Sequence, residues 1–198
     1  MYYDVIISGF GGQGILLIGN VLASAAMSEG KHVSYLPTYG VEMRGGTANC
    51  TVVISTEEIG SPIIGKPLSA IIMNTPSLKK FETHLKPGGL LLLNNSLVDL
   101  RDVSREEIEM VPVPFNEIAS QSGNSKLANM VALGAYVEKT RVIEEASIPD
   151  ALISSLDERH HHMIPANLEA IRRGRDFIRD QKEDLYGRGK NPCRDESR

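Results

Sequence analysis

The chain has 198 residues, of which 41% are hydrophobic, and a formal net charge of -4. This length suits one sizeable α/β domain or one domain with an extension, and the lack of a basic excess argues against nucleic acid as a partner. Two cysteines, Cys50 and Cys193, are too few for a disulfide framework, or for an iron–sulfur or structural zinc site held by this chain alone.

The first 36 residues predict a βαβ unit. Residues 4–8 are β-branched and apolar on both faces, as in a buried parallel strand. A helix follows over 13–29 and ends at Gly30. Its apolar positions recur at helical spacing: Ile15, Ile18, Leu22, Ala25 and Ala26. A second strand over 32–36 is expected to end at Pro37.

No secretory leader precedes the first strand, and no apolar run approaches the roughly 20 residues that span a bilayer. We therefore expect a cytoplasmic protein that does not bind a membrane. These are expectations about the residues present in this sequence.

Strands and helices alternate along the rest of the chain. In order, we predict a strand over 50–55, an extended piece over 59–64, a strand over 69–74, a helix over 76–85, strands over 90–94 and 109–113, and helices over 115–120, 126–139, 149–159 and 166–182. The helix over 126–139 is apolar nearly all round, so we expect neighbours on both of its sides. The pattern predicts one three-layer α/β/α domain over 1–184, with a Rossmann-like first βαβ unit and a partly irregular, mixed sheet, followed by a polar tail over 185–198.

The turn after the first strand fits the pattern G-x-G-x-x-G, in the strand-to-helix context that this pattern requires. Glycines allow positive φ and close approach of a ligand, and the N-terminus of the next helix favours a phosphate or another anion. The candidate binding residues are Gly9, Gly11, Gly12, Gln13 and Gly14. The alternative is that these glycines only permit a tight turn and close packing.

A nicotinamide or flavin site of the usual dinucleotide type needs an acidic residue at the end of the second strand. That place holds Tyr35, Leu36, Pro37 and Thr38, and the nearest carboxylate, Glu42, lies beyond a proline. The sequence therefore disfavours an NAD(P)-dependent dehydrogenase.

The stretch 39–49 is a second candidate binding segment. We expect this loop to face the same crevice as the glycine loop, at the carboxyl ends of the strands. Arg44 can offer a guanidinium to a carboxylate or phosphate, helped by backbone N–H groups of Gly45, Gly46 and Thr47. The alternative is that Arg44 pairs with Glu42 or with a neighbouring chain.

Other conspicuous residues favour structural roles. His160, His161 and His162 are consecutive and point to different sides, so we expect surface histidines and no metal site. Cys50 and Ser8 are interpreted as buried strand residues rather than nucleophiles, since neither stands in a nucleophile motif.

Several separate motifs resemble those of the gamma subunits of 2-oxoacid:ferredoxin (acceptor) oxidoreductases, and most resemble the 2-oxoglutarate type. They are GFGGQGILLIGNVLA, PTYGVEMRGGTANCTVVIS, Ser61-Pro62, NTPSLKKFETHLKPGGLLLLNNS and KLANMVALGAYVE. They stand in the order found in that family, and the resemblance covers residues 3–180.

The resemblance implies a chain that works only within a complex. Enzymes of this family convert a 2-oxoacid and coenzyme A to acyl-CoA and carbon dioxide, with thiamine diphosphate and magnesium between alpha- and beta-type subunits. Iron–sulfur clusters in beta- or delta-type subunits pass electrons to ferredoxin. The gamma-type subunit packs over the assembly and is implicated in closing around coenzyme A. The two glycine-rich loops would then help hold coenzyme A, and the chain would supply no catalytic residue.

Two other functions remain open at this stage. The chain can be a stand-alone nucleotide- or coenzyme-binding module without catalysis, or a dehydrogenase with its own nicotinamide site. Surfaces meant for partner subunits are often apolar, so the isolated chain is also expected to be able to form a homodimer.

Overall fold

The computed structural model describes residues 1–39 and 47–187. Within these residues, six strands form one sheet in the order β2-β3-β1-β4-β5-β6. Their bounds are β1 Tyr2–Phe10, β2 His32–Tyr39, β3 Thr47–Ser55, β4 Ser69–Ile72, β5 Leu90–Asn94 and β6 Glu109–Val113. The strands β1, β4, β5 and β6 run parallel, whereas β3 runs antiparallel between β1 and β2. The predicted mixed sheet is confirmed.

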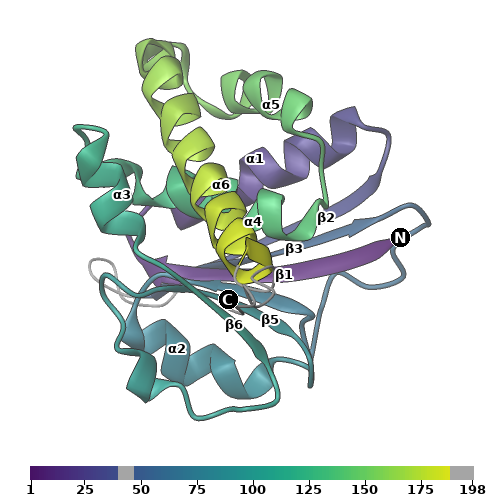
Figure 1. Cartoon of the computed structure of the whole chain (residues 1–198). Helices are drawn as coiled ribbons and strands as arrows, with labels where there is room; N and C mark the ends of the chain where they lie inside the picture. Colours follow the sequence, from purple (N-terminus) through teal and green to yellow (C-terminus); the bar gives the residue numbers. More distant parts are fainter. Residues whose placement is uncertain (40–46, 188–198) are drawn as a thin grey trace, which may run out of the picture.

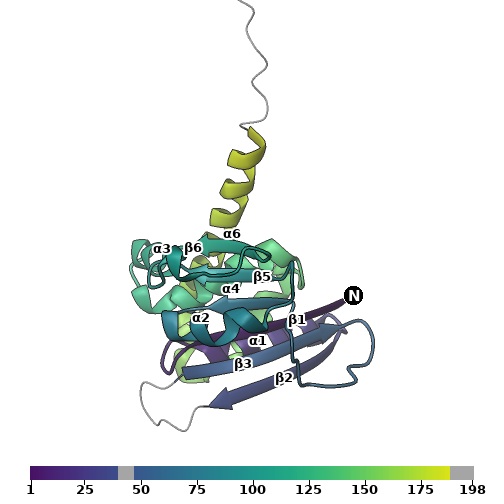
Figure 2. The same ribbon diagram turned by 90° about the horizontal axis from the view of Figure 1, so that it is seen from below.

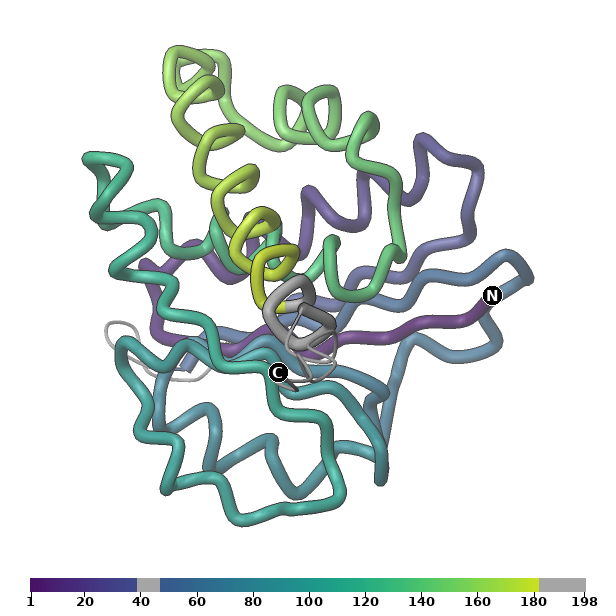
Figure 3. The backbone as a smooth tube through the Cα atoms, viewed as in Figure 1, coloured from purple at the N-terminus to yellow at the C-terminus, as the bar shows by residue number. Residues whose placement is uncertain are grey.

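Helices cover both faces of the sheet (Figure 1). One face carries α1 (Ile15–Ser28), α4 (Ala128–Thr140), α5 (Ile148–Ser155) and α6 (Ile164–Gly187), while α2 (Thr75–Phe81) lies on the other and α3 (Phe115–Gln121) follows β6. Short 3₁₀ turns cover Glu82–His84, Leu100–Asp102, Ser125–Leu127, Glu145–Ser147 and Glu158–Met163. The tube in Figure 3 shows that the chain visits the lower face between β4 and β6 and then returns to the upper one. This arrangement confirms the predicted three layers.

The first βαβ unit differs from the expected one in its neighbours. The strands β1 and β2 are joined through α1 as predicted, but β3 is inserted between them. The irregularity of the sheet therefore begins inside the first unit, because β3 follows β2 without an intervening helix and pairs back against it. Figure 2 shows β2, β3 and β1 side by side from below.

The sheet has a switch point between β1 and β4. From β1 the chain crosses to β2 on one side through α1, whereas β4 lies on the other side and leads to β5 through α2 on the opposite face. The carboxyl ends of two such parallel strands border a crevice, and this is where open α/β sheets bind ligands.

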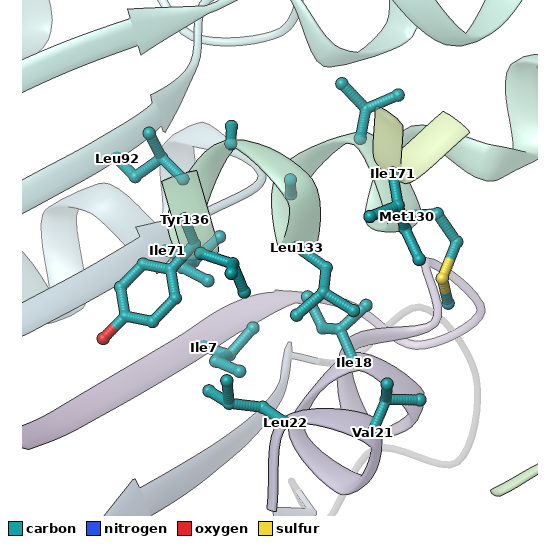
Figure 4. Packing of buried hydrophobic residues seen from close by; sticks show 14 of the residues in the cluster. Ile7, Ile18, Val21, Leu22, Ile71, Leu92, Met130, Leu133, Tyr136 and Ile171 are labelled. Carbon is teal, nitrogen blue, oxygen red and sulfur yellow. The ribbon is translucent and has the colours of Figure 1, made fainter. Parts of the chain in front are cut away.

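The helix α4 lies between the sheet and α6, which confirms the expectation of neighbours on both sides. Every residue from 128 to 138 is buried. In Figure 4, Leu133 points between Ile7 of β1 and Ile18 of α1, and Tyr136 lies beside Ile71. Because this apolar layer joins all the upper helices to the sheet, it holds the start of α1 rigidly against the ends of the strands.

The helices α4 and α6 approach so closely that their crossing excludes any side chain. A Cβ added to Gly134 would lie 1.9 Å from the carbonyl oxygen of Ile171, and one added to Gly174 would lie 2.0 Å from that of Val131. Each glycine therefore faces the backbone of the other helix, and both are required for this contact.

Both edge strands contain a proline. The strand β2 continues through Pro37 to Tyr39, so the prediction that Pro37 ends this strand is wrong. An edge strand tolerates proline because the missing N–H can face outward instead of into the sheet. The opposite edge strand, β6, contains Pro112, and its end residues Glu109 and Val113 form backbone hydrogen bonds with the residues that flank β5.

Other boundaries also differ. The predicted extended piece over 59–64 is wrong, since the described residues 56–68 contain no strand; glycines and prolines interrupt this segment. The helix predicted over 149–159 ends at Ser155 and is followed by a separate 3₁₀ turn, and the last helix runs longer, from Ile164 to Gly187. The last turns of α6 extend away from the other elements (Figure 2). The tail predicted over 185–198 lies outside the described residues apart from the end of α6, and the domain division stays a prediction.

Among the helices described, none combines the length and apolar character that crossing a bilayer requires.

Candidate ligand-binding site

The glycine loop lies at the switch point, between the end of β1 and the start of α1. Gly12 and Gly14 have φ of 95° and 71°, in the left-handed region that favours glycine. Gly11 and Gly12 are exposed, and a Cβ added to Gly12 would meet nothing within 4 Å. This part of the loop therefore leaves room for another molecule to approach the backbone.

The other two glycines are needed for packing. A Cβ on Gly9 would lie 2.7 Å from Ile15 Cδ1 and 2.9 Å from Met73 Cβ. A Cβ on Gly14 would lie 2.2 Å from Asn129 Nδ2, which donates to the carbonyl oxygen of Gly14 over 3.4 Å. Gly9 and Gly14 therefore fit the packing interpretation of the motif, and binding of a ligand at Gly11 and Gly12 stays a prediction.

The N-terminus of α1 is not capped by a side chain. Gly14 occupies the N-cap position, and it has no side chain to accept from the first turn. The first N–H groups of a helix have no partner within the helix, and they carry partial positive charge. Electrostatics at this end of α1 therefore favour an anionic group.

Side-chain amides connect the glycine loop to β4. Gln13 Oε1 accepts from the backbone N–H of Phe10 over 2.6 Å and from Asn74 Nδ2 over 3.3 Å. Asn74 follows β4, and its Oδ1 caps α2 by accepting from the N–H of Ser77 over 2.9 Å. The loop is therefore held in place by the end of the neighbouring strand.

A buried serine pair extends this connection to β3. Ser8 of β1 donates to Ser77 Oγ over 2.9 Å and lies 3.5 Å from the carbonyl oxygen of Ala48. Ser8 is buried, in agreement with its predicted role in the strand. Ala48 is next to Thr47, so hydrogen bonds link the glycine loop to the start of the second candidate segment.

The register of the sheet brings the two candidate segments to the same end of the sheet, where β1 ends and β3 begins. Thr47 pairs with Phe10 across β3 and β1, and Tyr39 pairs with Ala48 across β2 and β3. Of the predicted binding residues, Gly9, Gly11, Gly12, Gln13, Gly14 and Thr47 are thus located at the same end of the sheet. Arg44, Gly45 and Gly46 lie outside the described residues, and their role stays a prediction.

Sequence reasoning missed several asparagines at the carboxyl ends of the strands. Asn94 ends β5, and its Nδ2 donates to the carbonyl oxygen of Met73 and to Asn116 Oδ1 over 3.3 and 2.8 Å. Its Oδ1 is buried and has no hydrogen-bond partner among the described residues, 1–39 and 47–187. The sequence holds a signal for their position, because Asn74 and Asn94 each stand at the end of a short apolar run.

Cys50 and the consecutive histidines have neighbours that indicate structural roles. Burial raises the pKa of the Cys50 thiol to about 12, so this cysteine stays protonated and unreactive, as expected of a core residue. A ring nitrogen of His161 lies 3.0 Å from the carbonyl oxygen of Leu156, and one of His162 lies 2.9 Å from that of Arg159.

The fold and the site together define an open α/β domain with a glycine loop at the switch point of its mixed sheet. The family model described as "Pyruvate ferredoxin/flavodoxin oxidoreductase" matches residues 4–177, and the chain belongs to this family.

Three similar proteins agree with this family. The ketoisovalerate oxidoreductase subunit VorA of Methanothermobacter marburgensis is 38% identical over 90% of this chain, which spans 37% of that relative's length. The 2-oxoglutarate synthase subunit KorC of the same organism is 33% identical over 90% of this chain and 97% of its own length. The crystal structure of a keto/oxoacid ferredoxin oxidoreductase gamma subunit from Geobacter sulfurreducens covers 90% of this chain and 99% of its own, with 28% identity and a TM-score of 0.77. The resemblance inferred from the sequence motifs is confirmed.

Proposed function

We propose that this chain is the gamma subunit of a cytoplasmic 2-oxoacid:ferredoxin oxidoreductase, most closely of the 2-oxoglutarate type. The family match over residues 4–177 carries this proposal. The choice of 2-oxoglutarate is supported by KorC, a separate subunit that the chain matches over 97% of its length. As a gamma subunit, the chain acts with alpha and beta subunits, and with a delta subunit where the complex has one, in the CoA-dependent oxidative decarboxylation of the 2-oxoacid, with electrons passing to ferredoxin.

A branched-chain 2-oxoacid is the second candidate substrate. The subunit VorA, whose name specifies ketoisovalerate, is more similar in sequence, at 38% against 33% identity. Its greater length weakens the comparison, because only 37% of VorA is matched.

The proposal divides the chemistry between subunits. Thiamine diphosphate with magnesium and the iron–sulfur clusters belong to the partner chains, because two cysteines cannot supply the roughly four ligands of a cluster. This chain contributes binding and orientation of the co-substrate coenzyme A, and no nucleophile or general base.

The residues around the switch point suit an anionic, polar co-substrate such as coenzyme A. The uncapped N-terminus of α1 favours negative charge, and the exposed glycines leave the backbone accessible. Arg44, Gly45 and Gly46 lie outside the described residues, and the sequence predicts that with Thr47 they contribute a cation and N–H donors to this site. These groups act by electrostatics and shape, which hold coenzyme A where the partner subunits can use it.

The complex itself provides the first test. The chain, purified with its native partners, is expected to carry thiamine diphosphate and iron–sulfur subunits and to reduce ferredoxin with 2-oxoglutarate and coenzyme A. Ketoisovalerate and pyruvate serve as competing substrates in the same assay. Turnover by the isolated chain, or recovery of the chain without stable companions, would contradict the proposal.

Arg44→Ala tests the second loop. Loss of the guanidinium is expected to raise the KM for coenzyme A about tenfold, or to weaken subunit assembly, because a charge-assisted hydrogen bond is removed. Steady-state kinetics and size-exclusion chromatography measure the two effects. Arg159→Ala is the matched control, because Arg159 pairs with Asp157 on the exposed surface. Unchanged turnover and intact assembly in Arg44→Ala would eliminate this role.

A further inference from the structure

The orientation of two side-chain amides at the switch point is determined by the backbone. Gln13 Oε1 lies 2.6 Å from the backbone nitrogen of Phe10, and Asn74 Oδ1 lies 2.9 Å from that of Ser77. A backbone N–H can only donate, so the amide atom that faces it must be the oxygen. The nitrogen of each amide therefore points away from the backbone group that its oxygen contacts.

The nitrogen of Asn74 points at Gln13. It donates to Gln13 Oε1 over 3.3 Å, so this oxygen accepts two hydrogen bonds and both of its lone pairs are used. Asn74 is 2% exposed, and its side chain is held at the end of β4 because it also caps α2. Through Asn74, the sheet fixes the orientation of a side chain in the glycine loop.

The nitrogen of Gln13 is left as a donor. Gln13 is partly exposed, and its Nε2 has no hydrogen-bond partner among residues 1–39 and 47–187. It belongs to the same loop as the exposed Gly11 and Gly12, and it directly precedes the uncapped N-terminus of α1. A fixed N–H donor beside free backbone N–H groups matches an oxygen acceptor, most strongly an anionic one.

We propose that Gln13 Nε2 donates a hydrogen bond to an anionic oxygen of the bound ligand, and that Asn74 is the positioning residue that aims this donor. The inference rests on the proposed function, which makes coenzyme A the ligand and its phosphate oxygens the acceptor. The carboxylate of the 2-oxoacid has the same acceptor chemistry, and the two sources are distinguished by which KM changes.

Gln13→Glu removes the donor and keeps the acceptor. One carboxylate oxygen still accepts from Phe10 and Asn74, while the other replaces Nε2 with negative charge. In the complete complex, the KM for coenzyme A is expected to rise at least about tenfold, with kcat within about twofold of the unsubstituted complex. Thermal stability is expected to be retained, because negative charge is favoured at the N-terminus of α1. A rise confined to the KM for the 2-oxoacid would support the donor and assign its acceptor to the substrate carboxylate.

Asn74→Asp removes the aiming donor and keeps the cap of α2. One aspartate oxygen still accepts from the N–H of Ser77, so the helix start is preserved, while the other faces Gln13 Oε1 and repels it. We expect the KM for coenzyme A to rise about fivefold, because the Gln13 amide loses its fixed orientation, and stability to fall somewhat, because a negative charge is placed where Asn74 is 2% exposed. Gln181→Glu is the matched control, since it makes the same amide-to-acid change on α6, and its KM values are expected to be those of the unsubstituted complex.

Two results would overturn the inference. The first is a KM for both substrates within about twofold of the unsubstituted value in both variants. The second is a loss of thermal stability in Gln13→Glu that parallels its KM, which would make Gln13 a purely structural residue. Either result leaves the proposed function intact if the unsubstituted complex turns over. An unsubstituted complex without coenzyme A-dependent turnover would instead overturn the proposed function, and this inference with it.

Discussion

Glycines are required in two regions of this molecule, for opposite reasons. In the glycine loop, Gly12 lies in open space and its backbone is exposed, so the absence of a side chain leaves room for another molecule. At the crossing of α4 and α6, Gly134 and Gly174 face backbone atoms at distances that no Cβ tolerates. In the first region the backbone is accessible to another molecule, whereas in the second it is covered by the neighbouring helix. The residue type is glycine in both.

This difference shows which of the required glycines can be recognised from the sequence alone. The loop is found because its glycines recur at a known spacing between a strand and a helix. The crossing gives no such pattern, since its two glycines, Gly134 and Gly174, are 40 positions apart and stand in different helices. An isolated glycine inside a helix is the local signal, and it does not specify the partner helix.

Alanine at the crossing is expected to have the largest effect. Gly174→Ala places a Cβ against the carbonyl of Val131, and backbone atoms cannot move aside as a flexible side chain can. We expect the free energy of unfolding to fall by about 3 kcal/mol, measured by chemical denaturation. Gly60→Ala is the control, because a Cβ there meets nothing within 4 Å, and it is expected to change stability by less than about 0.5 kcal/mol. Equal stability of the two variants would refute the close crossing.

The loop glycines are expected to show smaller losses that separate packing from accessibility. Gly14→Ala combines a φ of 71° with a clash against Asn129, so it is expected to cost about 2 kcal/mol. Gly12→Ala has only the strain of its φ of 95° and is expected to cost about 1 kcal/mol, with a greater effect on coenzyme binding than on stability. Denaturation and coenzyme titration of the complex measure both quantities. A larger loss for Gly12→Ala than for Gly14→Ala would contradict this ranking.

The exposed side of α6 is expected to give the smallest effect. Glu169 accepts hydrogen bonds from Arg172 and Arg173, and these lower its pKa to about 2. A carboxyl with a lower pKa in the folded state stabilises the fold above its unfolded pKa near 4.3, and this contribution is lost as pH falls toward 2. Glu169→Gln should therefore cost a few tenths of a kcal/mol at neutral pH, because solvent screens the pair, and progressively less as the pH falls to 2 and below. A difference in unfolding temperature that persists in acid would oppose this account.

The predictable part of the fold was the part set by local pattern. The strands Leu90–Asn94 and Glu109–Val113 have the predicted bounds, because short apolar runs between turn residues define both ends. The position of β3 between β1 and β2 was not predictable, because strand pairing depends on contacts distant in sequence. The prediction that Pro37 ends its strand was wrong for the same reason. A proline ends a central strand but is tolerated in an edge strand. Whether a strand lies at the edge depends on the pairing of the whole sheet.

The candidate site divides in the same way. The glycine loop is readable from its spacing, whereas Asn74 acquires its role from two contacts that only folding creates. No pattern in the sequence indicates that Asn74, two positions after β4, orients the side chain of Gln13.

The prolines at both margins of the sheet also restrict how this chain can assemble with others. A continuous sheet across two subunits needs an unbroken row of donors and acceptors along the joining margin, and Pro37 and Pro112 each remove a donor from an outermost strand. Edge-to-edge pairing of identical chains into fibres is disfavoured for the same reason. Recognition of companions through side chains of helices and loops is therefore favoured, and this mode of contact distinguishes one companion from another better than shared main-chain bonds do.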